Sequence, residues 1–208
     1  MTRLALAFIA LFSLSAFAQE ERFQEGVHYT LISDATASSS DSGKVTVYEV
    51  FGYLCPHCFS FQPFVTAWHD NLPDTVDFVR VPAIFSPAWE PLGRAYLTAE
   101  MLGVAENGHD ALYKAIHQER KQIRTIEDAA DFFANYGADR DTFISTASSF
   151  AVDAKVRQYQ ALVRKWGVRG TPSLVVNGKY LISVSKVVPQ PVMLEVADFL
   201  IAKEAATE

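Results

Sequence analysis

The chain has 208 residues, half of them hydrophobic, and carries 18 basic and 24 acidic residues for a formal net charge of −6 at pH 7. This hydrophobic content excludes an intrinsically disordered protein, because disordered chains lack the apolar residues that form a core. The acidic balance argues against nucleic acid as a partner, since binding phosphates requires a basic surface.

Residues 1–18 are typical of a secretory signal peptide. Arg3 precedes an apolar run over 4–12, and Ala16-Phe17-Ala18 matches the pattern after which such signals are cleaved. The run is short for a bilayer span, although an uncleaved anchor and a core helix are the alternatives. Export would place the protein in an oxidising compartment, where disulfides persist, and we expect the bacterial periplasm.

Residues 27–32 predict a short edge strand, and the Ser-, Ala- and Asp-rich residues 33–43 predict a flexible surface loop. In residues 44–51, apolar side chains occupy both the odd and the even positions. This pattern indicates a central strand covered on both faces, as in a parallel α/β sheet. Glu49 interrupts this strand, where a buried carboxylate is unfavourable. Either the strand tilts so that Glu49 reaches solvent or a lysine, or Glu49 is a buried proton acceptor beneath nearby thiols.

Cys55 and Cys58 are the only cysteines, and they follow that strand. Pro56 suits the first turn of a helix, where Cys55 would meet unpaired N–H groups and the positive end of the helix dipole. Both favour a thiolate, and Cys58, one turn later, can reach back to it. The spacing therefore predicts a reversible disulfide.

Other interpretations of the cysteine pair are weaker. A structural zinc site needs four ligands, and the histidines are not spaced to complete one, so we expect no metal. Haem attachment requires His after the second cysteine, where Phe59 stands. A purely structural disulfide closing so short a loop would restrain the unfolded chain very little.

The helix that begins at Pro56 carries one apolar stripe, and Pro63 should kink it. Residues 76–81 alternate as a second strand. The following residues show only helical patterns, with Thr125 as an N-cap and Asp128 at the capping-box position. The helices are expected over 92–102, 110–118, 126–136 and 139–148.

A longer helix is expected over 152–166, ended by Gly167. Asn177-Gly178 is a strong hairpin signal between strands at 173–176 and 179–183. Pro189 and Pro191 then open a last amphipathic helix.

This order of elements resembles the thioredoxin fold with a helical insertion, and specifically the DsbA-type thiol:disulfide oxidoreductases. The match is carried by Cys55-Pro56-His57-Cys58, Gly170-Thr171-Pro172 and Val176-Asn177-Gly178-Lys179-Tyr180, and it covers nearly the whole mature chain. The resemblance implies an α/β, thioredoxin-like fold with an inserted all-helical domain. Its parts would be the signal peptide 1–18, the thioredoxin-like segments 19–86 and 151–208, and the insertion 87–150.

The resemblance also implies a role for each residue of the active-site motif. Cys55 would be the exposed nucleophile and Cys58 the buried resolving thiol. His57 would donate a hydrogen bond or positive charge to the Cys55 thiolate, with a merely solvated surface histidine as the alternative.

Around the motif, the resemblance implies that Pro172 is cis and faces the dithiol. Thr171 and Pro56 would contact an incoming polypeptide in an extended pose. Glu49 falls at the family's buried acidic position. Thr171 departs from the valine familiar at its position, which would alter substrate preference or the environment of the leaving group.

The implied activity is an enzyme that donates its Cys55–Cys58 disulfide through a mixed-disulfide intermediate, without a cofactor. Its substrates would be unfolded or folding exported polypeptides with free thiols. A quinone-linked membrane oxidase of the DsbB type would reoxidise it, and we expect a monomer. A reductant, an isomerase with a dimerisation module and a non-enzymatic binding module are the alternatives. The equilibrium potential against glutathione separates the oxidant from the reductant.

Overall fold

The computed structural model describes residues 22–33 and 43–206. The predicted signal peptide and nearly all of the predicted loop at 33–43 lie outside this range. Within the described residues, no helix combines the length and the apolar character needed to cross a bilayer.

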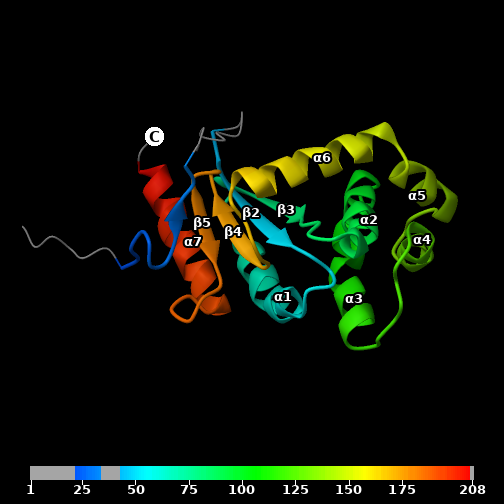
Figure 1. The fold of residues 1–208 in the computed structure, drawn as a ribbon, viewed down its shortest axis with the longest axis horizontal. Helices are drawn as coiled ribbons and strands as arrows, with labels where there is room; N and C mark the ends of the chain where they lie inside the picture. The colour runs from blue at the N-terminus through cyan, green and yellow to red at the C-terminus, as the bar shows by residue number, and fades with distance from the viewer. Residues whose placement is uncertain (1–21, 34–42, 207–208) are drawn as a thin grey trace, which may run out of the picture.

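The core of the molecule is a five-stranded mixed sheet with the order β1-β5-β4-β2-β3 (Figure 1). The strands are β1 (Thr30–Leu31), β2 (Val45–Phe51), β3 (Val76–Pro82), β4 (Ser173–Val176) and β5 (Tyr180–Ser183). Among these described strands, only the β2–β3 pair is parallel, and the β2–β4, β4–β5 and β1–β5 pairs are antiparallel. The expectation of a parallel sheet is therefore right for one pair and wrong for the others.

Strand β2 is buried on both faces, as its sequence predicts. Val45 and Val47 join a cluster with helices α1 (Pro56–His69) and α7 (Gln190–Ala205), while Val50 joins a second cluster with the helical block. Alternating side chains of a strand point to opposite faces, so β2 separates the two clusters. This burial fixes the end of β2, where the cysteine motif begins.

The segment between β3 and β4 is helical throughout, as expected. Its elements are η1 (Pro87–Trp89), α2 (Glu90–Met101), α3 (Ala105–His117), α4 (Ile126–Ala134), α5 (Arg140–Ala147) and α6 (Phe150–Lys165). Thr125 and Asp128 form the predicted capping box at the start of α4. Figure 1 shows α6 running from α5 back towards the sheet, where Trp166, its C-cap, packs on Tyr48 with ring centroids 4.8 Å apart.

Helix α3 begins at Ala105, earlier than the predicted residue 110. The first turn buries Gly108 and His109, which do not form an apolar pattern in the sequence. Gly108 is required there, because a Cβ at this position would lie 2.5 Å from the Phe133 ring. Further along α3, the rings of His109 and Tyr113 lie 5.2 Å and 6.4 Å, centroid to centroid, from the Phe51 ring at the end of β2.

The predicted hairpin is confirmed, and both of its turn residues, Asn177 and Gly178, have positive φ angles of 50° and 65°. The Asn177 side chain accepts a hydrogen bond from the Thr46 amide at 2.9 Å and donates one to Glu204 at 2.7 Å. The turn is thereby tied to β2 and to α7, which holds β4 and the residues before it in place.

Candidate active site

Cys55 lies at the junction of β2 and α1, where it is the N-cap of the helix. Its amide donates to the Gly52 carbonyl at 3.0 Å, and its Sγ accepts a hydrogen bond from the Cys58 amide at 3.3 Å. Gly52 allows this turn, because a Cβ there would lie 2.1 Å from the Trp89 ring. The sulfur is thus placed at the positive end of the helix, as the sequence predicts.

Thr171 and Pro172 lie against the cysteine motif, although they are far from it in the sequence. In its protonated form, Cys55 donates a hydrogen bond from its thiol to the Thr171 carbonyl at 3.3 Å, and the Thr171–Pro172 peptide bond is cis, as the resemblance implies. A cavity of about 320 Å³ adjoins these two residues and is also lined by Gly170, Ser173 and Val184. An extended polypeptide lying there would meet backbone groups beside Cys55.

Both cysteines are free thiols in this structure, and both are buried. The expectation of an exposed Cys55 is wrong, because only 6% of the residue is accessible, against 0% for Cys58. The helix start and the Thr171 carbonyl cover Cys55 from two sides. A difference in access remains, but it is small.

The two thiols differ far more in acidity. The pKa of Cys55 is lowered from 9.0 to about 5 by a hydrogen bond from the Cys58 thiol, with further hydrogen bonds from the Thr171 side chain and the Cys58 and His57 amides, against an opposing effect of burial. The pKa of Cys58 is raised, first by burial and then by the hydrogen bond and negative charge of Cys55. Near neutral pH, Cys55 is therefore the thiolate and Cys58 the thiol.

The other two residues of the motif, Pro56 and His57, are exposed in the first turn of α1. The His57 amide contributes to the low pKa of Cys55, while its carbonyl accepts a hydrogen bond from Gln190 Nε2 at 2.5 Å. In the described part of the chain, no hydrogen bond joins the imidazole to the sulfur. The structure therefore supports a backbone contribution from His57.

Glu49 is fully buried in β2, so the interpretation in which it reaches solvent or a lysine is wrong. Its partner is Arg80 on the neighbouring β3, with Nε 3.5 Å from Glu49 Oε2. Burial raises the pKa of Glu49 from 4.5 to about 7, although the positive charge of Arg80 acts in the opposite direction. A carboxyl with this pKa exchanges a proton readily near neutral pH.

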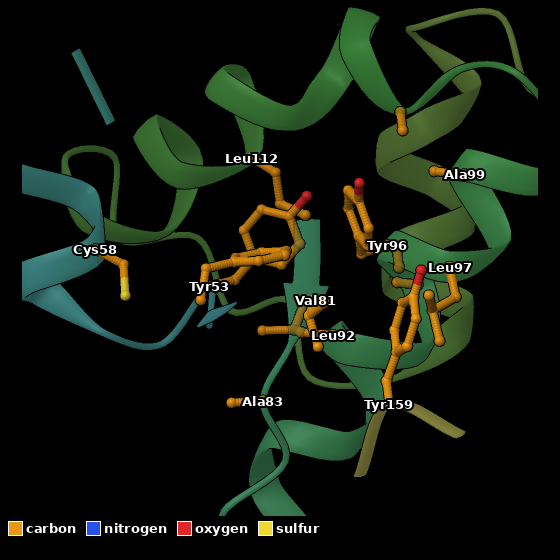
Figure 2. Close-up of a cluster of buried hydrophobic side chains, with 14 of the residues drawn as sticks. Tyr53, Cys58, Val81, Ala83, Leu92, Tyr96, Leu97, Ala99, Leu112 and Tyr159 are labelled. Atoms are coloured by element: carbon orange, nitrogen blue, oxygen red, sulfur yellow. The ribbon is translucent and has the colours of Figure 1, made fainter. Parts of the chain in front are cut away.

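Sequence reasoning missed three buried polar side chains beside the motif: Tyr53, His109 and Tyr113. Tyr53 Oη lies 2.7 Å from His109 Nδ1, and burial lowers the pKa of His109 so that its ring is neutral. Tyr113 is 1% exposed, and burial followed by the negative charges of Cys58 and Glu49 raises the pKa of its hydroxyl. Figure 2 shows Tyr53 and Cys58 in the same buried cluster. Tyr53 lies in the turn before α1, and His109 and Tyr113 lie on α3. In a sequence, such aromatic side chains resemble ordinary core positions, so no signal marked them.

Within the described residues, no three His, Cys, Asp or Glu side chains are grouped so as to hold a metal ion.

The sequence is similar to a known protein family. The sequence model described as a DSBA-like thioredoxin domain matches residues 69–190, which begin after the cysteine motif. Two relatives, both called "Thiol:disulfide interchange protein DsbA", extend the match across the motif. The one from Pseudomonas aeruginosa is 39% identical over 201 residues, and the one from Pseudomonas syringae is 39% identical over 202. Each alignment covers 97% of this chain and 94% of the relative.

The fold is also similar to a solved structure. The crystal structure of Pseudomonas aeruginosa DsbA superposes with a TM-score of 0.83 at 39% identity, covering 89% of this chain and 96% of the other.

Proposed function

This chain belongs to the family of DsbA-like thioredoxin-fold proteins, and we propose that its Cys55–Cys58 disulfide is the group that it passes to exported polypeptides. Membership of this family confirms the predicted thioredoxin-like fold with a helical insertion. It also means that the protein is a disulfide-donating oxidoreductase that acts on protein thiols. The observation that carries our assignment of residues is the hydrogen-bonded Cys55 sulfur at the start of α1, beside Thr171.

In the first step, a substrate thiolate attacks the Cys55 sulfur of the oxidised enzyme. The Cys55–Cys58 bond breaks, a mixed disulfide with Cys55 forms, and Cys58 leaves with the electron pair. Because burial raises the pKa of Cys58, this sulfur must take up a proton. We assign the proton to the Glu49 carboxyl, since its pKa of about 7 lets it hold a proton at neutral pH.

In the second step, the substrate's other thiolate attacks the substrate sulfur of the mixed disulfide. A disulfide forms in the substrate, and Cys55 leaves as a thiolate. Two electrons have then passed from substrate to enzyme. The lowered pKa of Cys55 makes it a good leaving group and favours the reduced enzyme.

The substrate contacts follow from the same geometry. We assign the backbone of Thr171 and the exposed ring of Pro56 to binding an extended polypeptide, with Pro172 lining the adjoining cavity. His57 acts mainly through its amide, which contributes to the low pKa of Cys55. The chemistry requires no cofactor besides the cysteine pair.

We further propose that the protein is a periplasmic monomer, released by cleavage after Ala18 and reoxidised by a quinone-linked membrane oxidase of the DsbB type. The periplasmic assignment is supported by the signal-like sequence of residues 1–18. We keep the division into a thioredoxin-like domain (19–86 and 151–208) and an insertion (87–150). Mass measurement of the exported protein tests the cleavage site, and sedimentation tests the monomer.

The function is tested by equilibrating the mature protein with glutathione and by following oxidation of a reduced two-cysteine peptide. We expect an oxidising potential and stoichiometric oxidation of the peptide by the oxidised enzyme. A strongly reducing potential would identify a reductant, and failure of the oxidised enzyme to oxidise the peptide would contradict the proposed donor.

A further inference from the structure

Arg80 is a buried cation placed between two carboxylates from different parts of the fold. Glu49 is its register partner across the β2–β3 pair, and Glu106 comes from the first turn of α3. Only 4% of the Arg80 side chain is exposed, so its guanidinium has few other partners. How Arg80 divides its contacts therefore determines the environment of Glu49.

Arg80 binds Glu106 more closely than it binds Glu49. Arg80 Nη1 donates a hydrogen bond to Glu106 Oε1 at 2.6 Å, whereas Arg80 Nε lies 3.5 Å from Glu49 Oε2 without making a hydrogen bond. Neither Glu49 oxygen has a hydrogen-bond partner among the described residues. Arginine usually binds a carboxylate with two parallel hydrogen bonds, and here the shortest contact goes to a side chain that is 70% exposed.

Among the described residues whose charges act on Glu49, Arg80 is the only cation. Asp110 and Glu106, both on α3, place negative charge near Glu49, with the influence of Asp110 the larger. Asp110 is itself bound by the Gln62 side chain at 2.8 Å. The hydroxyls of Tyr53 and Tyr113 are buried and lie within electrostatic range of Glu49. Arg80 is therefore the group able to fix Glu49 as a carboxylate.

We propose that Glu106 is a positioning residue for the redox site: by binding the Arg80 guanidinium from the surface, it keeps Arg80 from forming hydrogen bonds with Glu49 and leaves the buried carboxyl able to take up and return a proton. This inference rests on the proposed role of Glu49. It gives the helical insertion a part in the chemistry, because α3 supplies a side chain that acts on β2 through β3.

The proposed role of Glu106 affects the transfer of one proton between Cys58 and Glu49. When Cys58 attacks a mixed disulfide on Cys55, its thiol proton passes to the Glu49 carboxylate, and it returns when Cys58 is released as a leaving group. If Arg80 were free to bind Glu49 with two hydrogen bonds, the carboxylate would be stabilised, its pKa would fall, and it would take up the Cys58 proton less readily. Loss of the negative charge of Glu106 would also lower the pKa of Glu49, because that charge raises it.

The test is a titration of the Glu49 carboxyl in the full-length mature protein, followed by ¹³C NMR, with Glu49→Gln to assign the signal. We expect Glu106→Gln to lower the pKa of Glu49 by about one unit or more, as an opposite charge at hydrogen-bonding distance does. Asp110→Asn is the matched control, because it removes a nearby negative charge without releasing Arg80. Glu119→Gln controls for net charge, since Glu119 is exposed and pairs with Lys121.

A shift in Glu106→Gln that exceeds the shift in Asp110→Asn supports the action through Arg80. A shift equal to or smaller than that of Asp110→Asn, or one matched by Glu119→Gln, would overturn it. The pH profile for expulsion of a peptide from its mixed disulfide with Cys55, in a Glu49→Gln variant, tests the proposed function separately. If this profile equals that of the wild type while the NMR shift is found, Glu106 positions Arg80, and Glu49 has no role in proton transfer.

Discussion

The amide N–H of Cys58 donates a hydrogen bond to the Sγ of Cys55 at 3.3 Å. This bond caps helix α1, and it also reaches the atom on which we place the negative charge. One local contact therefore begins the helix and stabilises a thiolate. The Cys58 sulfur, one turn later and fully buried, lies in the opposite environment.

We expect brief alkylation of the reduced protein at neutral pH to modify Cys55 almost alone. Cys55 is ionised at this pH, whereas the pKa of Cys58 is raised by burial and by Cys55. Below the Cys55 pKa of about 5, the rate should fall about tenfold per pH unit. Mass mapping of a timed iodoacetamide reaction measures this, and equal labelling of both cysteines would contradict the assignment of nucleophile and resolving thiol.

Thr171→Val should raise the pKa of Cys55, because it removes the side-chain hydrogen bond that favours the thiolate. Thr171→Ser, which keeps the hydroxyl, should leave the pKa nearly unchanged. The ultraviolet absorbance of the thiolate follows both titrations. If the valine variant titrates like the wild type, the Thr171 side chain has no influence on the sulfur.

Glu49→Gln should stabilise the protein in a pH-dependent way. The pKa of Glu49 is about 7 in the folded protein and ordinarily 4.5, so the folded state binds the proton more tightly and the free energy of unfolding falls as pH rises between these values. The glutamine variant avoids this loss, and should be more stable by on the order of 3 kcal/mol above pH ~7 and about equal below pH ~4.5. Urea unfolding at both pH values measures it, and a difference that does not change with pH would refute the raised pKa.

Cys58→Ala should accumulate mixed disulfides between Cys55 and exported proteins, because the internal thiol that expels the client is missing. These adducts appear as high-mass bands that disappear on reduction. Cys55→Ala should form none and should abolish oxidase activity. If Cys58→Ala also traps nothing in an exporting cell, the protein is not exchanging disulfides with its clients.

Local patterns in the sequence predicted most of the fold. The buried strand at 45–51, the helix beginning at Pro56 and the Asn177-Gly178 hairpin each depend on residues close in sequence, and each is present. The sheet direction was predicted less well, since an apolar strand does not reveal the direction of its neighbours. The early start of α3 was missed because it depends on Gly108 fitting against Phe133, a long-range contact.

The candidate site, like the fold, could be predicted from the sequence only in part. The positions of Cys55 and Cys58 follow from strand, proline and spacing, and these can be recognised in the sequence. The burial of Cys55 beneath Thr171 and the pairing of Glu49 with Arg80 depend on segments that meet only in the folded chain. The positions of Arg80 and Glu106 in the sequence did not indicate that either residue lies near Glu49.

The central claim is that the folded protein stabilises the Cys55 thiolate, which makes the disulfide oxidising. The pKa of Cys55 is depressed from 9.0 to about 5, so this stabilisation is full above the unfolded pKa, about half present at neutral pH and lost as pH falls to the folded pKa. Because solvent screens part of the charge, we expect on the order of 1–2 kcal/mol at pH ~7.

The direct test is urea unfolding of the reduced and oxidised forms at neutral pH and near pH ~4. We predict that the reduced form is the more stable at neutral pH and that the gap narrows on acidification, since the thiolate exists only in the reduced form. An oxidised form at least as stable as the reduced form at neutral pH would contradict the claim.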